Sequence, residues 1–165
     1  MSPRTLTVWT AIVAALLMVY LWSSRPPEPL PDTPWISFTK DMVQAIDIQK
    51  SPETPLRLNR AGGQWMRATD TGNVPIDTGM VMGFLDMLLA LRADYAVTDS
   101  PAKFGLFDLA DTVPMTIHLG DSPSIILYAG KASPGGEFTY MRRAEESRIW
   151  AIRGFQEWAV RRLRH

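Results

Sequence analysis

The side chains that could do catalysis or bind metal are few in this sequence and stand far apart. The chain has no cysteine, which excludes thiolate nucleophiles, thiolate metal sites and disulfides. His118 lies on the polar face of an expected strand, where a surface histidine is the default, and His165 is the last residue. Scattered aspartates stand at expected strand ends and turns, where capping explains them: Asp94, Asp99, Asp108 and Asp111. We therefore predict no enzyme activity and no catalytic, metal or cofactor site.

The glycine-containing segments do not suggest phosphate chemistry either. The glycine pairs at 62–63 and 135–136 lie in hairpin contexts, not between a strand and a helix.

A short apolar segment, Phe104-Gly105-Leu106, stands before a proline and an alternating run. We expect a turn or two of helix here that buries four apolar side chains over an open end of the core, namely Phe104, Leu106, Phe107 and Leu109. Gly105 would allow a tight or left-handed bend.

Composition bounds the size and the partners of the protein. The chain has 165 residues, of which 46% are hydrophobic, so it can form one domain with a core and an appendage. The formal net charge is 0, which argues against binding nucleic acid through bulk electrostatics. Residues 142–165 nevertheless hold seven arginines and three glutamates, so a basic end follows an acidic body.

Residues 6–22 are predicted to anchor the chain in a membrane. The segment carries no charged residue, and as a helix it would span about 25 Å of a bilayer core of about 30 Å. Its aromatic residues Trp9, Tyr20 and Trp22 lie near the ends, where they would meet lipid head groups. A cleaved signal peptide is the alternative, but Trp22 and the prolines that follow Arg25 disfavour cleavage.

The segments around this anchor predict how the chain is oriented. Residues 1–5 hold Arg4 and would stay in the cytoplasm, which places the body in the periplasm at the bacterial inner membrane. Residues 23–34 hold five of the 13 prolines and are predicted to form an extended spacer. Residues 35–165 would then form the periplasmic domain.

This domain shows the pattern of an antiparallel sheet and one helix. Asp77 is the expected N-cap of a helix reaching Arg92. The helix would have one buried stripe, formed by Val81, Phe84, Leu85, Leu88 and Leu89. Short apolar segments predict strands at residues 42–49, 56–59, 64–68, 93–99, 113–119, 124–131, 138–144 and 148–153. Residues 69–76 are expected to form a polar loop. The predicted fold is α+β, an antiparallel β-sheet packed by one long helix and preceded by a single N-terminal transmembrane helix.

Several short motifs follow one another in this domain, namely Trp65, Asp77, Phe104-Gly105-Leu106, Pro114, Gly130, Gly135-Gly136 and Tyr140-Met141-Arg142. Their order resembles that of a family of bacterial membrane-anchored domains of unknown function found in auxiliary proteins of gliding-motility-type ABC transporters. The resemblance covers about residues 35 to 153. It implies a subunit of a membrane complex. The family has no established catalytic residues, so it implies none here.

Residues 154–164 are predicted to form a basic helix at the C-terminus. Phe155, Trp158, Ala159 and Leu163 would share one side of it. Its arginines crowd the last turn, where they suit the helix dipole, and a solvated capping helix is the alternative to a contact with acidic lipids or an acidic partner. The predicted partner-binding residues are Trp9, Tyr20 and Trp22 in the anchor and Trp158, Arg161, Arg162 and Arg164 in this helix.

These features predict a non-enzymatic, single-pass accessory or scaffold subunit of a larger inner-membrane complex, which could be a transporter or a respiratory or photosynthetic assembly. Its partners would be integral membrane subunits, and lipids through the anchor. The alternative is a periplasmic module that is tethered to the membrane and binds a glycan or a peptide. A hydrolase with a site assembled from distant acids is the third hypothesis and has the least support.

Overall fold

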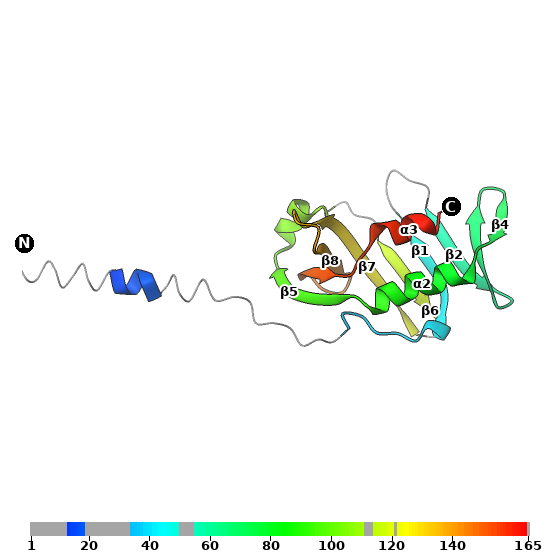
Figure 1. The fold of residues 1–165 in the computed structure, drawn as a ribbon, viewed down its shortest axis with the longest axis horizontal. Coiled ribbons are helices and arrows are strands. Elements are labelled where there is room, and N and C mark those ends of the chain that lie inside the picture. The colour runs from blue at the N-terminus through cyan, green and yellow to red at the C-terminus, as the bar shows by residue number, and fades with distance from the viewer. Residues whose placement is uncertain (1–12, 19–33, 50–54, 111–113, 121, 165) are drawn as a thin grey trace, which may run out of the picture.

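The computed structural model describes residues 13–18, 34–49, 55–110, 114–120 and 122–164. One antiparallel sheet of nine strands dominates it, in the order β4-β3-β2-β1-β6-β7-β8-β9-β5 (Figure 1). The strands are β1 Val43–Ile48, β2 Leu56–Ala61, β3 Gln64–Thr69, β4 Gly72–Pro75, β5 Arg92–Thr98, β6 Met115–Leu119, β7 Ser122–Ala132, β8 Thr139–Arg143 and β9 Ile149–Arg153.

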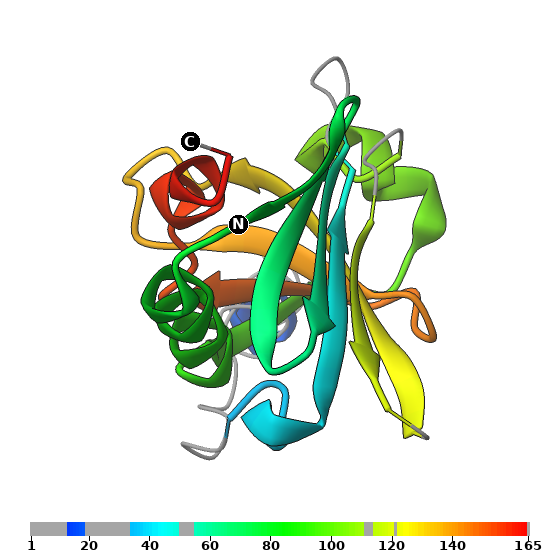
Figure 2. The same cartoon turned by 90° about the vertical axis from the view of Figure 1, so that its right-hand side faces the viewer.

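The helices are short compared with the sheet. They are α2 at Thr78–Leu89, α3 at Glu157–Arg162 and two 3₁₀ helices, η1 at Lys40–Met42 and η2 at Pro101–Phe107. Both α2 and α3 lie on the same side of the strongly curved sheet (Figure 2). The predicted fold, a sheet packed by one long helix, is therefore wrong, because the sheet is the main body and α2 has only 12 residues.

Two local features explain this difference. The helix ends at Leu89 with Ala90 as its C-cap, and Arg92, expected at the end of the helix, pairs with Arg153 in the sheet instead. Residues 72–75, expected in a loop, form β4 and pair with β3. Gly72, at the start of β4, has a φ of 125°, which lets the chain reverse within the polar segment.

The predicted transmembrane helix is also not found. Within the described part of the chain, no helix has both the length and the apolar character needed to cross a membrane. Residues 13–18 are helical and exposed. Most of the predicted anchor, with Trp9, Tyr20 and Trp22, lies outside the described residues, as do residues 1–5 and 23–33.

The main core lies between the inner face of the sheet and the two helices. Alternating strand residues such as Ile46, Leu58 and Ile117 are buried on this face. Trp65 and Phe84 are among its largest buried side chains. The buried residues of α2 are Val81, Phe84, Leu85 and Leu88, so the expected apolar stripe is confirmed for these four.

The outer face of the sheet is partly covered by η2. Leu109 is 1% exposed, whereas Leu106 is 64% exposed, so the expectation that Leu106 is buried is wrong. A 3₁₀ helix repeats every three residues, so Phe104 and Phe107 share one side and Leu106 points away. The left-handed residue is Asp108, with a φ of 56°, and not Gly105.

Candidate functional site

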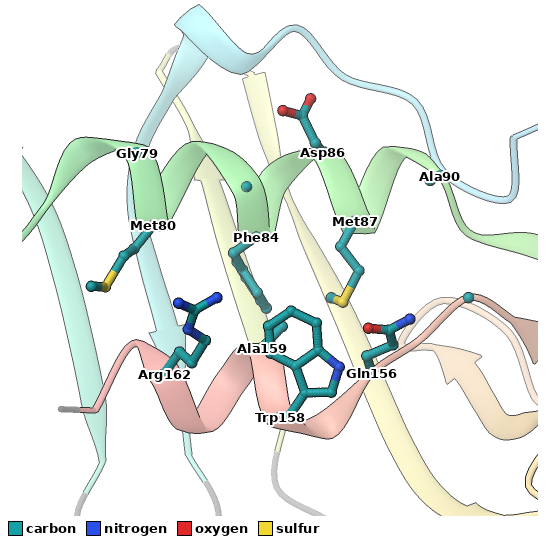
Figure 3. A pocket seen from close by; sticks show the side chains of 12 residues that line it. Gly79, Met80, Phe84, Asp86, Met87, Ala90, Gln156, Trp158, Ala159 and Arg162 are labelled. Carbon is teal, nitrogen blue, oxygen red and sulfur yellow. The ribbon is translucent and has the colours of Figure 1, made fainter.

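A groove of about 570 Å³ lies between α2 and α3 on the helical side of the domain (Figure 3). The start of α2 is fixed by the predicted N-cap, since the Gly79 N–H donates to the Asp77 carboxylate at 2.6 Å. The groove is lined by Gly79, Met80, Gly83, Phe84, Asp86, Met87, Ala90, Gly154, Gln156, Trp158, Ala159 and Arg162.

One wall of the groove is the exposed face of α2. Met80 is 42% exposed, and Met80, Phe84 and Met87 point toward α3 (Figure 3). Phe84 belongs to the main core and forms the floor. Gly83 leaves this wall open, because a Cβ added there would meet no heavy atom within 4 Å. On this side the groove therefore has a fixed aromatic residue, Phe84, and two flexible methionine side chains, which can adapt to the shape of a bound partner.

The other wall is α3, which the core holds in place. Val160 and Leu163 are buried at 6% and 1% exposure. Arg67 of β3 donates to the carbonyl oxygens of Leu163 at 3.5 Å and Arg164 at 2.5 Å, so it caps the end of the helix. Trp158 is 54% exposed whereas Leu163 is buried, so these two residues do not lie on the same side of the helix as predicted.

The predicted arginines of this helix have different surroundings. Arg162 lines the groove, with its guanidinium 5.6 Å from the centre of the Trp158 ring. Arg161 is exposed and lies 3.8 Å from Glu157, one turn away. Arg164 is half-buried. The structure therefore brings two predicted partner-binding residues together, Trp158 and Arg162.

The charges around the groove are unequal. Asp86 points away from α3 (Figure 3), and its carboxylate is 2.7 Å from the ammonium of Lys40. Arg162 takes part in none of the ion pairs found between described residues. The groove therefore has apolar walls and one positive charge that faces its interior.

A polar cluster that the sequence did not predict lies on the outer face of the sheet. The His118 Nε2 atom is 3.1 Å from the Asp47 carboxylate, and its Nδ1 is 3.0 Å from the Ser124 hydroxyl. These residue types occur in nucleophilic catalysis, which also needs a water-excluded site with fixed donors for an oxyanion. The side chains of His118 and Asp47 are 41% and 33% exposed, so this cluster is open to water. We interpret it as a link between β1, β6 and β7.

Among the described residues, no group of three or more potential metal ligands is found. The pKa of Tyr95 is raised, chiefly by burial and also by Tyr140 and Asp94 nearby. Tyr95 packs against Phe138 with ring centres 5.7 Å apart, which is a structural contact.

Comparison with known proteins gives one match. A family model described as "Domain of unknown function (DUF4340)" matches residues 65–162, from β3 to the last residue of α3. No curated protein and no solved structure matches the chain. The matched segment contains every residue that lines the groove.

Proposed function

We propose, for a chain that belongs to the DUF4340 family, that it is a non-enzymatic accessory or scaffold subunit of a larger membrane complex. The groove between α2 and α3 would be the surface that docks on a partner. The observation that carries this proposal is the exposure of Trp158 beside Met80, Met87 and Arg162.

Exposed side chains of these types are typical of protein interfaces. Tryptophan, methionine and arginine are enriched in interfaces, and tryptophan and arginine are enriched among the residues that dominate binding energy. The position of Trp158 is fixed, because Val160 and Leu163 of the same segment are buried in the core. A rigid aromatic side chain loses little conformational entropy when a partner covers it. Trp158 is therefore well placed to be the main anchor of the contact.

The type of complex rests on sequence features. The resemblance to auxiliary proteins of gliding-motility-type ABC transporters favours a transporter over a respiratory or photosynthetic assembly. The apolar composition of residues 6–22 and the position of Arg4 support a location at the bacterial inner membrane, with the domain in the periplasm. Cell fractionation, with protease treatment of spheroplasts, tests this location. A full-length chain that resists protease until the cells are lysed would reject it.

A module that binds a soluble peptide is the second candidate function. The groove volume, about 570 Å³, falls in the range of ligand sites. Its largely apolar walls favour a peptide over a glycan, which needs many hydrogen-bonding groups. A subunit and a binding module differ in the lifetime of the contact. The subunit purifies with its partner at fixed stoichiometry, whereas a transient ligand is lost on washing.

The docking role is tested by co-purification of the tagged full-length chain from its native cells with two variants. Trp158→Ala removes the proposed anchor, and we expect loss of about 2 kcal/mol of binding, roughly 30-fold in Kd, with an unchanged melting temperature. Leu106→Ala is the matched control, because Leu106 is also apolar and exposed but lies on η2. Equal recovery of the partner with both variants would reject the groove as the docking surface.

A further inference from the structure

We infer that the occupant of the groove is an amphipathic helix that places an acidic side chain against Arg162. This inference rests on the proposed docking function and adds the chemistry of the partner. Three observations carry it: the spacing of the apolar side chains, the single inward-facing charge, and the composition of the rest of the chain.

The spacing of the apolar side chains fits a helix. Met80 and Met87 are seven residues apart on α2, so they lie about 10.5 Å apart along its axis. A helix lying beside α2 presents its own apolar side chains with the same seven-residue repeat. Trp158, on the opposite wall, and Phe84, on the floor, complete an apolar channel. The open position above Gly83 leaves room for one large side chain of the partner.

The charge of the groove selects an acidic partner. A docked helix would cover Arg162 and remove water from its guanidinium, which is costly unless a carboxylate replaces that water. Lys40, another basic residue near the groove, already pairs with Asp86 at 2.7 Å and would have to break this ion pair to bind the carboxylate of the partner. A guanidinium can also bind both oxygens of a carboxylate at once. A glutamate or aspartate beside the apolar face of the partner helix meets this need.

A peptide explains these features better than a membrane surface. Binding to anionic lipids usually needs several clustered basic residues, whereas Arg161 is close to Glu157 and only Arg162 faces the groove. The apolar helical segment of the chain itself is also a poor occupant, because residues 13–18 contain no acidic residue. That segment would leave Arg162 covered and unpaired.

The test uses the full-length protein and two labelled synthetic peptides with the same helical apolar face. One peptide carries glutamate beside that face, and the other carries lysine at the same position. We expect the glutamate peptide to bind at least fivefold more tightly in fluorescence anisotropy. Arg162→Glu should reverse this preference, and Arg161→Glu, outside the groove, should leave it unchanged. Gly83→Leu should abolish binding of both peptides while the melting temperature is kept.

Several results would overturn the inference. Equal binding of the two peptides, or binding of neither, rejects an acidic helix as the occupant. Binding to phosphatidylglycerol vesicles that depends on Arg162, without binding of the glutamate peptide, assigns the groove to lipid. A dimer that Gly83→Leu dissociates assigns it to a second copy of the chain. In each case, co-purification that still depends on Trp158 would keep the docking function while the acidic helix is rejected.

Discussion

Gly130 on β7 is the position where one added methyl group should damage the fold most. A Cβ built at Gly130 would lie 2.9 Å from Cγ of Leu109 and would overlap the carbonyl oxygen of Phe107. The leucine side chain could rotate, but the carbonyl is part of the backbone at the end of η2. Gly130→Ala can therefore be accommodated only if η2 moves away from the outer face of the sheet.

The cost of this movement follows from what η2 covers. If the segment lifts, Leu109, which is 1% exposed, loses its buried environment. Loss of a buried leucine side chain costs about 2–5 kcal/mol, and insertion of a methyl group into a packed site costs about 1–3 kcal/mol. We expect Gly130→Ala to lower the free energy of unfolding by about 3 kcal/mol. This loss corresponds to a fall in melting temperature of roughly 10 °C.

Urea denaturation, followed by circular dichroism, measures this change. Gly105→Ala is the matched control, because Gly105 lies in η2 and an added Cβ there would meet no heavy atom within 4 Å. We expect the control to be neutral or slightly stabilising, since alanine restricts the unfolded chain. A Gly130→Ala protein within about 0.5 kcal/mol of the parent would refute the packing of η2 against β7.

Three further predictions concern single side chains. Leu109 is buried and Leu106 is exposed, so Leu109→Ala should lower the free energy of unfolding by about 2–5 kcal/mol and Leu106→Ala by less than about 0.5 kcal/mol. A larger loss for Leu106→Ala than for Leu109→Ala in urea denaturation would contradict the orientation of η2. Asp77→Ala should cost about 1 kcal/mol in the same assay, because it removes the N-cap bond of α2, whereas Asp77→Asn should keep most of it. The hydrogen bond from Arg148 lowers the pKa of Asp99. The contribution of this pair to stability is therefore fully present above about pH 4, the usual pKa of an aspartate, and is lost as the pH falls through the lowered pKa of Asp99. Denaturation at several pH values should show that Asp99→Asn removes this dependence, and an identical pH profile for the variant would exclude the pair as its source.

Local signals in the sequence predicted the parts of the fold that depend on neighbouring residues. Asp77 caps α2 as expected, because a cap needs only a side chain and the next few backbone N–H groups. The Gly62-Gly63 hairpin is also confirmed, with φ values of 57° and 84°, and it joins β2 to β3. In both places the interactions that determine the structure join residues no more than four positions apart in the sequence.

Features that depend on distant contacts could not be predicted in this way. The burial of Leu109 was expected, whereas the exposure of Leu106 was not. Leu106 lies on the side of the 3₁₀ helix away from Phe104 and Phe107, and Leu109 follows η2 after the left-handed Asp108, a local geometry that the apolar pattern does not specify. The contact between His118 and Asp47 joins residues 71 positions apart. Trp158 was correctly placed on a short helix, but its exposure depends on how α3 rests against the sheet. The groove itself needs both helices, so the sequence predicted some of its residues and not its shape.

The position of β5 in the sheet has a consequence for how the protein is made. This strand follows α2 directly, yet among the described strands its partner is β9, with Arg92 opposite Arg153. At a translation rate of 5–20 residues per second, β5 leaves the ribosome roughly 3–12 s before β9 is available. During that interval its backbone N–H and C=O groups have no ladder to join, and an open strand edge invites pairing with other chains. A ribosome that stalls between Thr98 and Ile149 would release a chain in which β5 lacks its partner strand, so such truncated chains should be prone to aggregate.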